Sequence, residues 1–190
     1  MLPRLQALLQ PLPWPVQLLL LALVIVASYY DIRYRRIPNW LTLPCVLVGF
    51  ALNAFLGRTV LSGLGDAGLA VGLALLLNFP LYLLHARGAG DVKLLSAIGA
   101  LVGWRAWVEI FILSGILGGV LAVVLMLAKG RFRKTLVNTG AIIEEMVHFR
   151  APHLKNEEFD VNSPLSFRLP QGAVIALGCC TLLGLQAFLR

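Results

Sequence analysis

Long apolar stretches separated by short polar segments dominate the pattern of this chain. Six of them stand out, at 14–30, 40–57, 67–85, 92–103, 107–128 and 172–189. A membrane-spanning helix needs about 17–25 mostly apolar residues, so five stretches are close to the length of a span, while 92–103 is short at about 18 Å of helix. The pattern predicts an all-α integral membrane protein, a six-transmembrane-helix bundle forming a single domain over residues 1–190, with one long loop at 129–171.

Composition supports a membrane protein and excludes most soluble classes. Of the 190 residues, 59% are hydrophobic and 13% are charged, whereas soluble domains carry about 25% charged residues. The three cysteines, Cys45, Cys179 and Cys180, form no C-x-x-C pair, and the three histidines share no ligand spacing with them. We therefore expect no metal site and no disulfide framework. No phosphate loop or dinucleotide fingerprint is present, so we expect no cofactor.

The position of the basic residues predicts the orientation of the bundle. The net charge is +7, and in a six-span topology with the N-terminus outside, twelve of the 16 lysines and arginines fall on the inner side. Cytoplasmic loops carry such an excess. The sequence thus predicts a multi-pass membrane protein, with 129–171 as its cytoplasmic loop. We expect the basic residues to face the lipid bilayer and its headgroups, and we expect no nucleic-acid partner. The sequence does not define an oligomeric state.

Two aspartates at the predicted inner boundary are the main candidates for chemistry. Asp31 closes the first apolar stretch, and Asp91 opens the fourth in Gly88-Ala89-Gly90-Asp91. An ionisable group at membrane depth is a functional candidate by default. Two carboxylates that share a proton can activate water and polarise a carbonyl without a metal. Gly88 and Gly90 would leave room for a substrate strand. Each aspartate alone also fits a structural role, as a helix cap or as a counter-ion for nearby arginines.

A second G-x-G-D sequence limits what this short motif can establish. Gly63-Leu64-Gly65-Asp66 matches it as well as the stretch at Asp91 does. In the predicted topology, however, Asp66 falls on the outer side, away from Asp31. We therefore interpret Asp66 as a cap of the third helix.

Small residues four apart predict close helix contacts within the bundle. The pattern occurs as Gly68-x-x-x-Gly72, Gly99-x-x-x-Gly103 and Gly115-x-x-x-Gly119. Such pairs let helix backbones approach closely in a membrane.

The two aspartate motifs resemble those of the type IV prepilin peptidases, membrane aspartic proteases of the G-x-G-D kind. The matching stretches are Tyr30-Asp31-Ile32-Arg33-Tyr34-Arg35-Arg36-Ile37-Pro38-Asn39-Trp40-Leu41-Thr42 and Gly88-Ala89-Gly90-Asp91-Val92-Lys93-Leu94. A weaker match, Leu169-Pro170-Gln171-Gly172-Ala173-Val174-Ile175-Ala176, enters the last helix. Family members usually have an aromatic residue where this chain has Gln171.

The resemblance implies an activity and its residues. It implies an endopeptidase that removes prepilin leaders at the cytoplasmic face of a prokaryotic inner membrane, with Asp31 and Asp91 as the catalytic pair. Arg33, Arg36 and Lys93 are candidate substrate contacts beside the two motifs. Larger members carry a cytoplasmic insertion with paired cysteines and also methylate the new N-terminus. The short connection between the first two helices here is similar to the peptidase-only form that serves Flp-type pili.

Other functions remain open from the sequence. Archaeal preflagellin peptidases share the same chemistry. Presenilin-type G-x-G-D proteases share the Tyr-Asp motif, but their catalytic residues lie in adjacent helices. A small transporter could use Asp31 and Asp91 for ions, although it would favour inverted repeats or broken helices, which are not evident.

Overall fold

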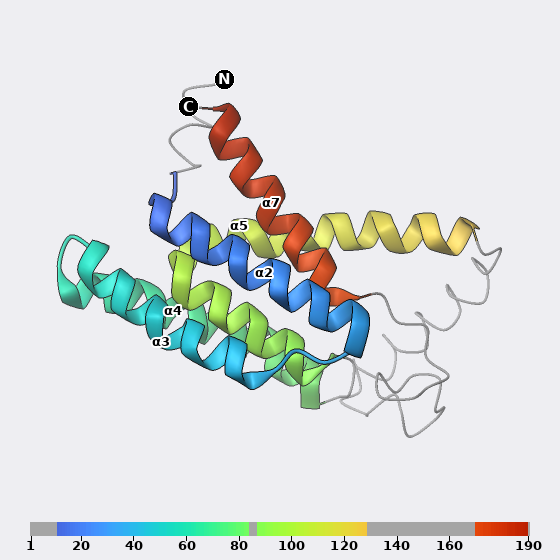
Figure 1. Ribbon diagram of the computed structural model, residues 1–190, viewed down its shortest axis with the longest axis horizontal. Coiled ribbons are helices and arrows are strands. Elements are labelled where there is room, and N and C mark those ends of the chain that lie inside the picture. The colour runs from blue at the N-terminus through green and yellow to red at the C-terminus, as the bar shows by residue number, and fades with distance from the viewer. Residues whose placement is uncertain (1–10, 84–86, 129–169, 190) are drawn as a thin grey trace.

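The computed structural model describes residues 11–83, 87–128 and 170–189, and every regular element in these ranges is a helix. The predicted all-α class is therefore confirmed. Five helices are long and apolar enough to cross a membrane (Figure 1). They are α2 (Trp14–Tyr34), α3 (Asn39–Leu56), α4 (Val60–Leu83), α5 (Ala89–Ala128) and α7 (Gln171–Phe188). The predicted loop lies outside the described residues up to position 169.

The prediction of six separate helices differs from the structure at α5. This helix covers both predicted stretches, 92–103 and 107–128, and it is interrupted by non-helical angles at Gly103 (φ 76°, ψ 171°). The Trp107 Nε1–H donates to the Leu95 carbonyl at 2.9 Å. In a straight helix, twelve residues would separate these groups by about 18 Å along the axis. α5 therefore folds back at Gly103 into a first arm, 89–102, and a second arm, 104–128 (Figure 1).

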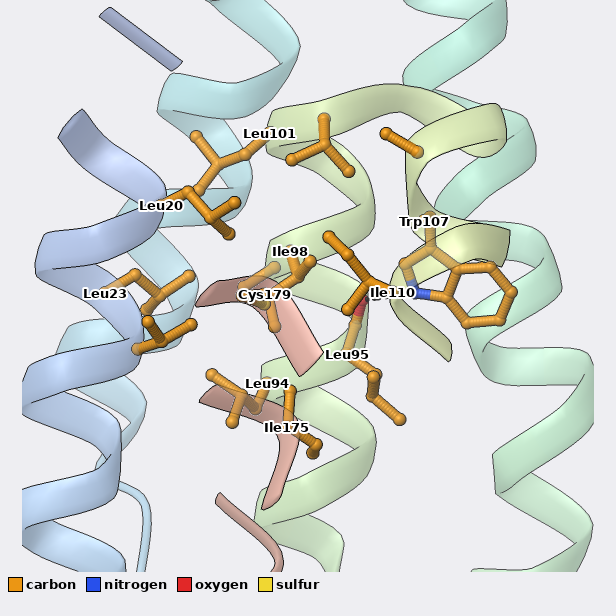
Figure 2. Packing of buried hydrophobic residues seen from close by; sticks show 14 of the residues in the cluster. Leu20, Leu23, Leu94, Leu95, Ile98, Leu101, Trp107, Ile110, Ile175 and Cys179 are labelled. Carbon is orange, nitrogen blue, oxygen red and sulfur yellow. Dashed lines mark hydrogen bonds between the residues drawn. The ribbon is translucent and has the colours of Figure 1, made fainter. Parts of the chain in front are cut away.

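The first arm of α5 is the centre of the bundle. Its residues are buried without a break from Leu94 to Gly103. A helix that is apolar all round is typically packed inside a protein. Leu94, Ile98 and Leu101 of the arm pack together with residues of α2, α7 and the second arm (Figure 2). The stretch 92–103 is too short to cross a bilayer easily while exposed to lipid, but it can do so as a helix surrounded by protein.

Asn53 of α3 stabilises the point where the first arm ends. Its Nδ2 donates to the carbonyls of Ala100 at 2.8 Å and Leu101 at 3.1 Å. Carbonyls in the last turn of a helix lack partners within that helix. The side chain of Asn53 therefore satisfies backbone groups that the turn at Gly103 would otherwise leave unpaired in an apolar setting.

α4 begins seven residues before the predicted start, and Asp66 is not its cap. Thr59 and Ser62 form the cap instead: the Ser62 N–H donates to Thr59 Oγ1 at 3.1 Å, and the Thr59 N–H donates to Ser62 Oγ at 3.0 Å. This reciprocal pair is a capping box built with serine. Asp66 lies inside the helix and is exposed, so the interpretation of Asp66 as a cap was wrong.

Only one of the three predicted small-residue pairs contributes a close contact. A Cβ on Gly99 would lie 3.1 Å from both Ala70 Cβ and Trp107 Cδ1. By contrast, a Cβ on any residue of the other two pairs would meet no described atom within 4 Å. The closest approaches occur at glycines that the pattern did not select, such as Gly49 against the backbone of Ala100. Spacing alone does not reveal which face of a helix meets a neighbour.

The two sequence motifs lie at one end of the bundle. We call this the aspartate end; it comprises the last turns of α2 and α4 and the first turns of α3, α5 and α7 (Figure 1). Asp66 and Gly103 lie at the opposite end, where a Cβ on Gly103 would be 3.8 Å from Asp66 Cβ. The expected separation of Asp66 from the other two aspartates therefore agrees with the fold.

Candidate active site

Asp31 lies in the last turn of α2 and is held by the first turn of α7. Its helix runs four residues beyond the predicted boundary, to Tyr34, and is capped by Arg35, whose left-handed angle (φ 55°) lets its N–H donate to the Asp31 carbonyl. Asp31 is 9% exposed, and its carboxylate Oδ2 accepts the Gly172 N–H at 2.7 Å. That N–H is one of the four at the start of α7 with no partner in their own helix, and the positive end of the helix favours an anion. The bond fixes the orientation of this carboxylate.

Gly172 is the residue that allows α7 to approach so closely. A Cβ at this position would lie 3.0 Å from Asp31 Cβ and 3.1 Å from Oδ2. Ser28, one turn before Asp31, donates from its Oγ to the Val24 carbonyl at 2.6 Å, and the same Oγ lies 3.3 Å from the Gly172 carbonyl. Both backbone groups of Gly172 therefore face α2. Sequence reasoning included Gly172 only within the weak third motif and assigned it no role.

Asp91 lies in the first turn of α5 and is equally buried, at 9% exposed. Its N–H donates to the Gly88 carbonyl at 3.2 Å, which shapes the turn that leads into the helix. A Cβ on Gly88 would lie 3.4 Å from Asp91 Oδ2. The guanidinium of Arg87 interacts electrostatically with the Asp91 carboxylate.

Arg87 is a site residue that the motifs did not single out. Its Nη1 donates to Oδ1 of Asn78, which is completely buried in α4 and donates in turn to the Ala74 carbonyl. Burial lowers the pKa of Arg87 below its ordinary value, and the nearby Asp91 carboxylate opposes that shift. A guanidinium remains charged in spite of such a shift. Asp91 thus has a partly buried cation as its neighbour.

Contacts between α3 and α5 link the Asp91 turn to the segment that follows Asp31. Lys93 Nζ donates to Asn39 Oδ1 at 2.9 Å. A Cβ on Gly90 would lie 3.3 Å from Cβ of Ile37, a buried residue of the α2–α3 connection. Gly90 therefore allows the backbone of α5 to approach this connection, a role that differs from the expected space for substrate.

The three predicted substrate contacts are all exposed at the aspartate end. Arg33, Arg36 and Lys93 have solvent-accessible side chains, and Arg36 borders a shallow hollow of about 420 Å³ with Tyr30, Tyr34 and Pro38. Their positions agree with a role at the surface, and Lys93 already has Asn39 as a partner. Among the described residues, no three His, Cys, Asp or Glu side chains are grouped closely enough to hold a metal ion.

Comparison with known proteins identifies the family of this chain. Residues 18–123 match the profile of the type IV leader peptidase family, a stretch that includes both Asp31 and Asp91. This match covers more than half of the chain. The chain belongs to the type IV leader peptidase family.

Relatives within the type IV leader peptidase family are longer than this chain. Prepilin leader peptidase/N-methyltransferases match from Myxococcus xanthus, at 29% identity over 126 residues (64% of this chain and 38% of the relative), and from Aeromonas hydrophila, at 34% over 130 residues (64% and 44%). That of Legionella pneumophila is 31% identical over 138 residues (67% and 47%). The chain thus spans less than half the length of these relatives. No solved structure matches it.

Proposed function

We propose that this chain is a membrane aspartic endopeptidase that cleaves the leader peptide of type IV or Flp-type prepilins at the cytoplasmic membrane face. The observation that carries the proposal is the family match over residues 18–123, which contains both candidate aspartates. Its relatives are prepilin leader peptidase/N-methyltransferases. The contacts at the aspartate end support the same function, because they bring two buried carboxylates to one end of the bundle.

In the proposed mechanism, Asp31 and Asp91 act as a pair that shares one proton. Two neighbouring carboxylates in a low-dielectric site cannot both ionise easily. The ionised member takes a proton from water as its oxygen attacks the scissile carbonyl carbon, and the protonated member donates to the carbonyl oxygen. The tetrahedral intermediate then collapses, the C–N bond breaks, and the leaving amine takes a proton from the pair. The Gly172 N–H and Arg87 would hold the two carboxylates in place.

Substitution of the aspartates tests the pair. We expect Asp31→Asn and Asp91→Asn each to abolish cleavage of a prepilin by the purified, reconstituted chain, because an amide cannot take part in the proton transfers. Asp66→Asn is the matched control and should retain activity, because Asp66 lies at the opposite end. Cleavage by Asp31→Asn at the wild-type rate would refute the assignment.

The topology that we propose has six crossings, with each arm of α5 spanning separately. The first arm is only about 21 Å long, less than the roughly 30 Å of a hydrocarbon core, and its burial inside the bundle accommodates the difference. The described basic residues favour the aspartate end as the cytoplasmic end. Five of them lie there, against Arg58 and Arg105 at the other end; the five are Arg33, Arg35, Arg36, Arg87 and Lys93.

Cysteine labelling tests this orientation. In a background with the three native cysteines replaced, Gly65→Cys should react with an impermeant reagent on intact cells. Tyr34→Cys should react only after permeabilisation. Both positions are exposed. The reverse pattern would put the aspartate end outside and would contradict cleavage at the cytoplasmic face.

We propose further that the chain is a peptidase without methyltransferase activity. The proposal rests on the short α2–α3 connection of residues 35–38, which lacks the paired-cysteine insertion of the larger members that the sequence resembles. Transfer of a labelled methyl group from S-adenosylmethionine to a cleaved pilin would overturn this point without affecting the peptidase assignment.

A further inference from the structure

The two candidate aspartates lie at opposite ends of their own helices. Asp31 is in the last turn of α2, whereas Asp91 is in the first turn of α5. A helix disfavours a negative charge at its C-terminal end and favours one at its N-terminal end. At Asp31 the Gly172 N–H, from the positive end of α7, offsets the unfavourable end of α2. Asp91 needs no such compensation, so the backbone favours the negative charge on Asp91.

The neighbouring side chains act in the same direction. An arginine interacts electrostatically with each carboxylate, Arg35 with Asp31 and Arg87 with Asp91. Arg35 is exposed, whereas Arg87 is half-buried, and water and salt screen an exposed charge more than a buried one. The other described cations of the aspartate end are also exposed; they are Arg33, Arg36 and Lys93. Among the described residues at this end, Arg87 is therefore the one shielded positive charge.

Contacts with α4 hold Arg87 in its place beside Asp91. Its Nη1 donates to Oδ1 of Asn78, and its backbone N–H donates to the Leu81 carbonyl at 3.2 Å. Asn78 is completely buried and is fixed by its own bond to the Ala74 carbonyl at 2.7 Å. Because Asn78 is neutral, it anchors the guanidinium without compensating its charge, which remains available to the Asp91 carboxylate.

We propose that Arg87, anchored by Asn78, is a positioning residue that divides the roles within the aspartate pair. Asp91 holds the negative charge and acts as the base, and Asp31 holds the shared proton and acts as the acid. This inference rests on the proposed function and assigns the roles that an undifferentiated pair would leave open. Since Oδ2 of Asp31 accepts the Gly172 N–H, the proton is carried on Oδ1, and Oδ1 is the oxygen that donates to the substrate.

The proton transfers balance under this assignment. Asp91 takes a proton from water as the water oxygen bonds to the scissile carbonyl carbon, and Asp31 donates its proton to the carbonyl oxygen. As the C–N bond breaks, Asp91 gives its proton to the leaving amine, and Asp31 recovers one from a hydroxyl of the intermediate. The pair thus returns to its starting state, with the negative charge again beside Arg87.

Removing the charge of Arg87 tests the assignment. The probe is a prepilin-like peptide with a basic leader, a glycine and an apolar helix of about 20 residues, cleaved by the full chain in liposomes. We expect Arg87→Gln to move the acidic limb of the pH profile of kcat/KM to higher pH by about 1–3 units, because Asp91 loses a neighbouring opposite charge. Arg87→Lys keeps the charge and should keep the limb in place. Arg58→Gln is the matched control, because Arg58 is exposed at the opposite end.

The results separate the role of Arg87 from the proposed function. A wild-type chain that does not cleave the peptide at any pH would refute the proposed function itself. Normal cleavage by the wild type, together with an acidic limb that stays in place in Arg87→Gln, would overturn only the role of Arg87. A residue that is merely structural would lower kcat in both Arg87 variants without moving the limb.

An infrared titration keeps the assignment testable if Arg87→Gln does not fold. Asp31→Asn leaves Asp91 as the remaining carboxyl of the pair, and Asp91→Asn leaves Asp31. The spectrum of the double variant is subtracted to remove the other acidic residues. We expect the carboxylic-acid C=O band of Asp91 to disappear at a lower pH than that of Asp31. The reverse order, or the same pH for both bands, would overturn the assignment of base and acid.

Discussion

Gly172→Ala is the sharpest single-atom test of the geometry around Asp31. The added Cβ would lie 3.0 Å from Asp31 Cβ and 3.1 Å from Oδ2. Asp31 Cβ is fixed by the backbone of α2, so the contact can be relieved only if α7 moves away by a few tenths of an ångström. That movement lengthens the 2.7 Å hydrogen bond from the Gly172 N–H to Oδ2.

The size of the effect follows from the bond that is weakened. A hydrogen bond to a charged group contributes about 1.5–3 kcal/mol, so losing half of it costs about 0.75–1.5 kcal/mol. If that loss falls on the transition state, kcat/KM decreases by about four- to tenfold. Alanine is the better helix former by up to about 1 kcal/mol, which offsets the strain in the folded state. We therefore expect reduced activity with a nearly unchanged melting temperature.

The assay compares kcat/KM for prepilin cleavage with thermal unfolding of the same reconstituted samples. Gly184→Ala is the control, because Gly184 is in the same helix and its Cβ would meet no described atom within 4 Å. It should keep full activity. Wild-type kcat/KM in Gly172→Ala would refute the reasoning that this bond orients a catalytic carboxylate. If the melting temperature of Gly172→Ala decreases clearly together with kcat/KM, the loss of activity follows from unfolding, and Gly172 has a purely structural role.

Two further predictions concern the fold. Gly63→Ala should lower the free energy of unfolding by about 1–3 kcal/mol, because its Cβ would overlap the Asn53 carbonyl oxygen. Gly65→Ala, where the Cβ meets no described atom within 4 Å, should be neutral in the same denaturation assay. Trp107→Phe should lower the free energy of unfolding by about 0.5–1.5 kcal/mol for the lost Nε1–H bond to the Leu95 carbonyl, and further because phenyl is smaller than the fully buried indole and leaves a cavity. A melting temperature equal to that of the wild type would show that this bond does not stabilise the fold-back of α5.

The sequence alone determined the membrane class, the helical architecture and the candidate aspartates. Long apolar stretches can satisfy their backbone groups in lipid only as helices, so composition and pattern decide the class. Two carboxylates at the ends of such stretches are conspicuous because charge is rare there. The motifs around Asp31 and Asp91 then led to the family to which residues 18–123 belong.

Tertiary structure decided what one-dimensional spacing cannot encode. It joined Gly172 to Asp31 across 141 residues and made Gly90 a contact for Ile37. It assigned the cap of α4 to Thr59 and Ser62 instead of Asp66, and it left most of the predicted glycine pairs open. The physical reason is that the helices are apolar on most faces, so the sequence does not mark which face meets another helix. The contacting face is defined by where two helix backbones approach closely, and such contacts exist only after the helices have packed.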